Sequence, residues 1–213
     1  MDKGLFEKSE EGTSQGGPLS PLLSNIMLNA LDKELERRGL PFVRYADDSM
    51  IFCKSKRAAK RVKESITRFI EGTLYLKINK EKTVVPYVQG VKYLGYSFYV
   101  MKGKCRLTVH PKSKSKIKSR LKELTNRSNG WGYVKRKQKL KEYIRGWIGY
   151  YHLADMKRFL LDTDEWLRRR IRMCIWKAWK KPKTKVANLI RCGIEKYKAC
   201  EWGNTRKGYW RIS

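Results

Sequence analysis

Acidic residues, long apolar runs and paired cysteines are all scarce in this sequence. The 213 residues include 20 Asp or Glu against 50 Lys or Arg, which gives a formal net charge of +30. Such a basic balance points to a polyanionic partner. No apolar run approaches the roughly 20 residues of a membrane-spanning helix, and no apolar leader follows Met1. We therefore expect neither a membrane protein nor a secreted one.

The five cysteines form no C-x-x-C pair, and their number is odd. This pattern is typical of reduced thiols in the cytoplasm rather than of a disulfide framework. The two histidines, His110 and His152, have no metal-type spacing to any cysteine. The sequence thus argues against a zinc site.

Enough apolar residues are present for a sizeable core. Hydrophobic residues make up 41% of the chain and aromatic residues 12%, which excludes a disordered basic tail. The charge is unevenly spread: residues 1–101 hold 17 Lys or Arg and 12 Asp or Glu, whereas residues 102–213 hold 33 and 8. The second half therefore carries most of the charge that a nucleic acid would meet.

Hydrophobic periodicity and turn signals predict an α+β first part and an all-helical second part, with a boundary near 108–112. After a Gly/Ser/Pro-rich loop at 12–21, a helix is predicted from Ser20 to about Leu35. The remaining predicted elements are short strands within 42–54, a helix at 56–71, strands near 75–79, 83–88, 92–100 and 104–109, and basic helices at 113–127, 136–151, 156–180 and 184–200.

The stretch "FVRYADDSMIF" (42–52) places Asp47 and Asp48 inside an otherwise apolar run. Adjacent carboxylates at a strand bend repel each other, and a hard cation such as Mg²⁺ removes that penalty. Two such ions can clamp the attacking and leaving oxygens of a phosphoryl transfer. The alternative interpretation is a solvated Asp-Asp turn.

Five ordered motifs resemble the group II intron reverse transcriptase/maturase family. "SQGGPLSPLLSNIMLN" precedes "YADD" by roughly thirty residues, and "LKINKEKT" (76–83), "VKYLGYSF" (91–98) and a long basic stretch from 140 to 184 follow. The last stretch is similar to the thumb region called domain X. The resemblance implies a partial reverse-transcriptase palm, an antiparallel sheet with helices, at 1–110 and a helical thumb/maturase domain at 111–213.

The resemblance also implies roles for individual residues. Asp47 and Asp48 would bind the catalytic Mg²⁺ ions, and Lys82 would support departure of pyrophosphate, although it could equally be a solvated lysine. The nucleotide and template would be contacted by Tyr45, Ala46, Gln15, Gly16, Gly17 and Pro18. The primer grip would be Tyr93, Leu94 and Gly95, for which a buried strand pair is the alternative.

One part of the family's pattern is missing. A palm of this type has a further carboxylate on an earlier strand, and nothing upstream of Gly12 resembles that motif. We therefore expect an incomplete metal site, a missing N-terminal fingers/palm half, and no synthesis by the chain alone. Smaller departures are Ser14, where relatives commonly carry proline, and Ser49, where a bulky apolar residue is usual.

The basic half suggests contact with RNA. All seven tryptophans follow residue 130, and helical spacing assigns most of them to packing. The predicted RNA-binding residues are Arg168, Arg169, Arg170, Lys177, Lys180, Lys181, Lys183 and Lys185. The implied partners are intron RNA, an RNA/DNA primer-template and deoxynucleoside triphosphates, in a bacterial-type cytoplasmic nucleoprotein without membrane contact. The alternatives are a non-catalytic RNA-binding maturase with a relic palm, and a generic basic binder in which "YADD" occurs by chance.

Overall fold

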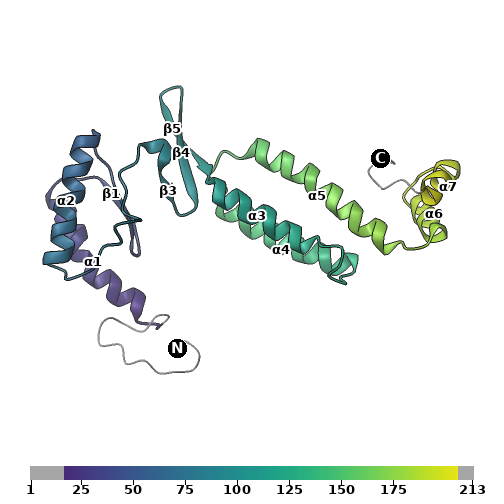
Figure 1. The fold of residues 1–213 in the computed structure, drawn as a ribbon, viewed down its shortest axis with the longest axis horizontal. Coiled ribbons are helices and arrows are strands. Elements are labelled where there is room, and N and C mark those ends of the chain that lie inside the picture. The colour runs from purple at the N-terminus through teal and green to yellow at the C-terminus, as the bar shows by residue number, and fades with distance from the viewer. Residues whose placement is uncertain (1–16, 206–213) are drawn as a thin grey trace. The chain divides into compact units, whose positions relative to one another are not determined.

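A computed structural model describes residues 17–205, so the predicted contact residues Gln15 and Gly16 lie outside the described residues. The chain divides into two compact units, Met1–Tyr93 and Leu94–Ser213. Both units contain helices and strands, and the strands are antiparallel where their register is defined (Figure 1). The predicted α+β class is confirmed.

The first unit is built from two helices and a hairpin. The helices and the hairpin are α1 (Ser20–Arg37), β1 (Phe42–Tyr45), β2 (Asp48–Ile51) and α2 (Lys56–Gly72). The two strands pair antiparallel, with Phe42 opposite Ile51 and Tyr45 opposite Asp48. Ser55 begins α2 by accepting a hydrogen bond from the amide of Ala58, because a side-chain oxygen at this position satisfies a free N–H of the first turn. The hairpin and both helices were predicted.

Leu31, Leu35 and Ile66 form the buried centre of the first unit, and Phe42 and Ile51 of the hairpin pack against it. The core therefore uses the C-terminal half of α1. Four apolar residues of the N-terminal half are exposed: Leu22, Leu23, Ile26 and Met27. Helical periodicity identified the apolar face, but not how much of it is covered.

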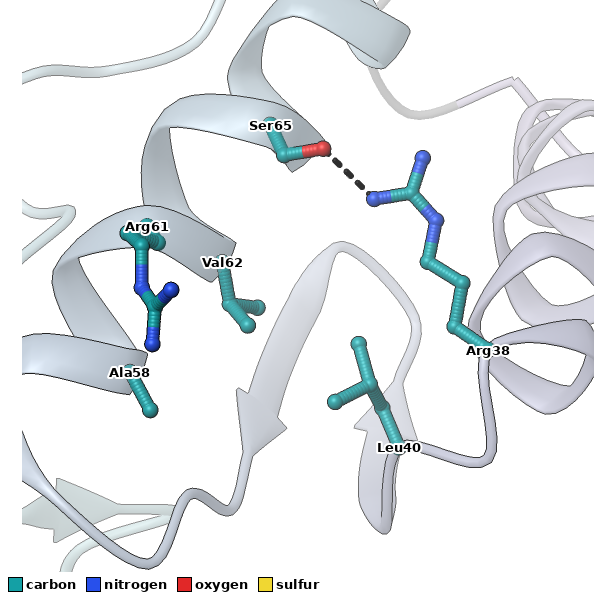
Figure 2. A pocket seen from close by; sticks show the side chains of 6 residues that line it. All are labelled: Arg38, Leu40, Ala58, Arg61, Val62 and Ser65. Atoms are coloured by element: carbon teal, nitrogen blue, oxygen red, sulfur yellow. Dashed lines mark hydrogen bonds between the residues drawn. The ribbon is translucent and has the colours of Figure 1, made fainter.

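A group of charged side chains joins the end of α1 to α2. Glu34 accepts hydrogen bonds from Arg37 and Arg38, and Arg38 Nη1 also donates to Ser65 Oγ at 2.6 Å. Arg38 and Ser65 line an open pocket of about 320 Å³, and its other walls are Leu40, Ala58, Arg61 and Val62 (Figure 2). The pKa of Glu34 is lowered to about 2, chiefly by the hydrogen bonds from the two arginines.

The strands predicted near 75–79 and 83–88 are absent from the structure. Residues 80–82 form a turn, in which the Thr83 amide donates to Asn79 O at 3.0 Å and the Lys82 amide donates to Asn79 Oδ1 at 3.1 Å. A short 3-10 helix, η1 (Val88–Gly90), follows. The amides of Lys82 and Thr83 are therefore bonded locally and are not offered to a neighbouring strand.

The strand predicted at 92–100 is interrupted. β3 (Lys92–Tyr93) is followed by Leu94 and Gly95, which have positive φ values of 49° and 81°. β4 (Tyr96–Met101) then pairs with β5 (Lys104–Val109), with Tyr96 opposite Val109. An added Cβ at Gly95 would lie 2.3 Å from Tyr151 Oη. Both the backbone conformation and the close approach therefore require glycine there.

The second unit continues with helices. They are α3 (Pro111–Leu124), α4 (Tyr133–Tyr150), α5 (Lys157–Ala178), α6 (Pro182–Arg191) and α7 (Lys196–Asn204). The core lies between α3, α4 and α5 and contains Ile117, Leu121, Leu124, Leu140 and Leu167. The single helix predicted at 184–200 is divided at Gly193, whose φ is +88°, because a left-handed residue ends a helix.

Among the described helices, none combines the length and the apolar composition that a bilayer span demands.

Replacing Glu34 by Gln should make the stability of the first unit less dependent on pH. The pKa of Glu34 is about 2 in the folded chain against 4.5 ordinarily, so its contribution is complete above pH 4.5 and is lost as the pH falls toward 2. Glu34→Gln should therefore lower the urea midpoint at pH 7 and make little difference near pH 2. NMR methyl signals of Leu31 and Leu35 report this unit locally. Glu36→Gln, an exposed change on the same helix, is the control, and an equal loss from it would contradict the argument.

Candidate functional site

The acidic pair lies at the tip of the β1–β2 hairpin. Ala46 and Asp47 form the turn, and Asp48 is the first residue of β2. Ala46 has a positive φ of 53°. Asp47 and Asp48 are exposed, and Tyr45 at the end of β1 is 64% exposed. The turn thus presents both carboxylates and the tyrosine ring to solvent.

Arg44 connects this turn to helix α1. Its Nε donates to Asp32 Oδ1 at 2.8 Å, its Nη2 lies 2.5 Å from Asp32 Oδ2, and its Nη1 donates to Asn25 Oδ1 at 2.9 Å. Nη1 also donates to the carbonyl of Ala46, at 2.9 Å. The hydrogen bonds to Asp32 raise the pKa of the Arg44 guanidinium. One planar cation therefore fixes both the helix and the turn backbone.

Sequence reasoning did not identify Arg44, Asp32 or Asn25 as part of the site. Two signals were available. Arg44 is a basic residue in an otherwise apolar strand next to the acidic pair, and Asn25 and Asp32 are seven residues apart on α1, which puts them on one helix face. Neither signal shows that the helix face and the strand meet.

Among the described residues, the carboxylates of this unit do not complete a two-metal site. Within residues 17–205 no group of three or more His, Cys, Asp or Glu side chains could hold a metal ion. Asp32 is bonded to Arg44, which leaves Asp47 and Asp48. Mg²⁺ accepts carboxylate oxygens, so the pair has the right chemistry for part of such a site, and the described residues do not supply the rest.

Tyr93 is the predicted primer-grip residue whose pKa responds to the charge of Asp48. Its hydroxyl is buried and has no hydrogen-bond partner among the described residues. Burial raises the pKa of Tyr93, the negative charge of Asp48 raises it further, and Arg44 lowers it. The structure therefore brings Tyr93, Asp48 and Arg44 into one electrostatic environment.

Leu94 and Gly95, the other two predicted primer-grip residues, form a turn that is held by helices of the second unit, which is called the helical unit below. The Leu94 carbonyl accepts a hydrogen bond from Tyr150 Oη at 2.9 Å. The Gly95 carbonyl accepts from Ser113 Oγ at 3.1 Å and from the His110 amide at 3.0 Å. The backbone of this turn is therefore fixed from α3 and α4.

The other predicted contacts of the first unit lie on loops. The Gly17 carbonyl accepts a hydrogen bond from the amide of Ser20 at the start of α1, and Pro18 is exposed beside it. Lys82 is exposed in the turn that follows Asn79. No hydrogen bond or ion pair among the described residues joins Lys82 to Asp47 or Asp48.

The predicted RNA-binding residues fall into two groups. Most are exposed and follow the second half of α5 and the connection to α6: Arg168, Arg169, Lys177, Lys180, Lys181 and Lys183. Arg168 also pairs with Asp164 at 2.7 Å on the helix surface, a contact that water screens strongly. Lys185 is half-buried, with its Nζ 4.8 Å from the centroid of the Trp176 ring.

Arg170 forms the second group. Hydrogen-bond donors of its guanidinium are used within the helical unit. Its Nε donates to Thr125 Oγ1 at 2.7 Å, and its Nη2 donates to the carbonyls of Lys122 and Thr125. These carbonyls end α3, where the last helical turn leaves acceptors without partners. The guanidinium also lies 5.3 Å from the Trp166 ring. Arg170 therefore closes α3 against α5.

Comparison with known families accounts for most of the chain. Residues 3–98 match the reverse transcriptase (RNA-dependent DNA polymerase) family, and residues 114–193 match the group II intron, maturase-specific domain. The chain belongs to the group II intron reverse transcriptase/maturase family. The order of the two matches agrees with the order of the acidic hairpin and the basic helices.

This chain matches parts of two longer curated relatives. Protein YkfC of Escherichia coli is 33% identical over an alignment that covers 45% of this chain and 34% of YkfC. The group II intron-encoded protein LtrA of Lactococcus lactis is 27% identical, with 47% of this chain and 28% of LtrA covered. The chain thus spans about a third of the length of the curated relatives it matches.

Replacing Arg44 by Met should loosen the acidic hairpin of this maturase-family chain. The change leaves Asp32 without its cation and removes the bond to the Ala46 carbonyl, which should cost the hairpin about 2 kcal/mol. Because the tryptophans all lie after residue 130, amide hydrogen exchange of β1 and β2 is the suitable measurement. Arg57→Met, an exposed change on α2, should leave this exchange unchanged. Equal effects of the two variants would show that Arg44 does not anchor the turn.

Proposed function

We propose that the chain supplies the catalytic hairpin and the RNA-binding helices of an RNA-directed DNA polymerase that also assists splicing of its group II intron RNA. One observation carries the proposal: an exposed Asp47–Asp48 turn and a strongly basic helical unit occur in one chain, within reverse-transcriptase and maturase matches. The substrates are deoxynucleoside triphosphates and a primer on an RNA template, and the cofactor is Mg²⁺.

In this proposal the hairpin presents two of the carboxylates that hold the metal ions. Mg²⁺ supplies charge neutralisation and alignment of the phosphates when bound. Tyr45 and Ala46 border the nucleotide, Gly17 and Pro18 lie beside the template, and Lys82 neutralises the departing pyrophosphate. Arg44 keeps the turn in one conformation, so that both carboxylates are pre-positioned.

Synthesis requires a further carboxylate from outside the described residues. Asp47 and Asp48 are adjacent, and Asp32 is held by Arg44. With few protein ligands Mg²⁺ keeps more of its waters and is bound weakly. We therefore propose that the chain by itself does not extend a primer.

A second candidate function is RNA binding and splicing assistance without synthesis. The observation that favours it is that no group of three potential metal ligands occurs within residues 17–205. In that case the hairpin serves as a scaffold and Asp47 has no chemical role. The two candidate functions predict different effects of Asp47→Ala on DNA synthesis.

A primer-extension assay separates the two functions. We expect no extension by the chain alone, and extension after fusion to the part of LtrA that precedes its matched segment. In the active fusion Asp47→Ala should abolish synthesis, because it removes a metal ligand, while RNA affinity stays within about threefold. Asp164→Ala, on the surface of α5, is the control and should retain synthesis. Robust extension by the chain alone would refute the incomplete site, and full activity of the Asp47→Ala fusion would favour the scaffold role.

The RNA-binding part of the proposal is supported by how the helical unit uses its cations. Arg170 is bonded within the unit, whereas Lys177, Lys181 and Lys183 are exposed at the end of α5 and the start of α6. Exposed ammonium groups at short spacing can neutralise successive phosphates and release their counterions. This arrangement favours phosphate contact at the α5–α6 connection.

Binding to a structured RNA should weaken steeply with salt. Replacing Lys177, Lys181 and Lys183 by Gln should lower affinity and reduce the slope of log affinity against log salt by about 3, because each lysine neutralises one phosphate. The matched control is the triple change of Lys56, Arg57 and Lys60 to Gln on α2. Filter binding at several salt concentrations provides the measurement. A flat salt dependence, or equal effects of the two triplets, would contradict the assignment of RNA binding to this connection.

A further inference from the structure

A cavity of about 290 Å³ opens between the start of α4 and the end of α5. Its volume is near the lower end of the roughly 300–1,000 Å³ of ligand sites. The walls that matter here are Trp131, Tyr133 and Arg136 on one side, and Cys174, Ile175 and Trp179 on the other. The cavity therefore combines aromatic rings with a cation.

Arg136 is buried in the wall of this cavity. It is 6% exposed, although a guanidinium is always charged and a buried charge normally has a partner. Its Nη2 donates to Asn129 Oδ1 at 3.0 Å, and its Nε has no hydrogen-bond partner among the described residues. The ion pairs found within residues 17–205 do not include Arg136. The cavity wall thus carries a positive charge that no carboxylate of the described chain compensates.

The aromatic walls lie beside further cations. Lys135 Nζ is 5.5 Å from the centroid of the Trp131 ring. The Trp179 ring is 6.2 Å from that of Trp176, and Lys185 Nζ lies over Trp176 at 4.8 Å. An apolar guest would fit the rings but leave Arg136 uncompensated, whereas a small inorganic anion would match Arg136 but leave the indoles unused.

We propose that this cavity binds one unpaired nucleotide of an RNA, with the base against the indole walls and an acceptor or phosphate oxygen of the nucleotide facing Arg136. Unpaired bases have flat faces that stack on aromatic side chains and edges that accept hydrogen bonds. A nucleotide therefore satisfies both features of the cavity at once. The inference rests on the proposed RNA binding and adds to it a site that selects RNA with an extruded base over continuous duplex.

The test compares the full chain with three RNA hairpins: fully paired, with a single bulged adenosine, and with an abasic bulge. The adenosine bulge should bind about tenfold more tightly than the paired hairpin, since stacking of one base on an aromatic side chain is worth a factor of roughly 5 to 150. The abasic bulge should bind like the paired hairpin. If the abasic and adenosine bulges bind equally, the cavity does not take a base and the proposal fails.

Variants connect this preference to the cavity. Arg136→Met keeps an unbranched apolar side chain but removes the guanidinium, and it should remove the preference for the adenosine bulge. Ala178→Phe fills the cavity from its edge without removing a buried group and should do the same, which keeps the test valid if Arg136→Met does not fold by circular dichroism. Lys181→Gln, outside the cavity, should weaken binding of all three hairpins by the same factor. A bulge preference that survives Ala178→Phe would overturn the proposal.

The outcomes also distinguish this inference from the proposed function. Equal, salt-dependent binding of all three hairpins would leave RNA binding standing and refute the nucleotide site. Absence of binding to every hairpin would refute the proposed RNA binding and the nucleotide site with it.

Discussion

Arg44 is the residue on which the arrangement of the acidic hairpin depends. Two adjacent carboxylates in a short turn repel each other, and a two-stranded hairpin is marginal by itself. The guanidinium of Arg44 bonds to Asp32 and Asn25 on α1 and to the Ala46 carbonyl in the turn. The turn is thus fixed through its backbone rather than through the Asp side chains. Asp47 and Asp48 stay exposed, and their oxygens remain available to a cation or a partner.

The helical unit divides its many cations between structure and surface. Acidic residues are few, so arginines that enter the unit bond to neutral acceptors: Arg170 to the carbonyls that end α3, and Arg136 to the amide oxygen of Asn129. Planar guanidinium groups suit this use because they offer several donors in fixed directions. Most of the lysines stay at the surface, where a polyanion can reach them. An excess of positive charge is compatible with this fold because the inward cations are held by oxygen dipoles.

Several elements followed from local sequence, and others did not. The helices predicted at 56–71 and 113–127 correspond to α2 and α3, and the apolar run around Asp47 and Asp48 does form a hairpin. The strands expected near 75–79 and 83–88 are absent, because β-forming residues make a strand only where another strand pairs with them. The helix expected at 184–200 is divided at Gly193, since an isolated glycine in a helical pattern does not reveal whether its φ is positive.

The sequence by itself determined the position of the acidic turn, the main helices, the charge asymmetry and the family, because these depend on composition, periodicity and ordered motifs. Tertiary structure decided which charged residues are available. Arg44, Arg136 and Arg170 are three basic residues among many in the sequence, yet the structure bonds Arg44 to Asp32 and Arg170 to the end of α3, and it places Arg136 in the wall of a cavity. The physical reason is that a cation's role depends on the acceptors around it, and the folding of the chain decides which acceptors those are.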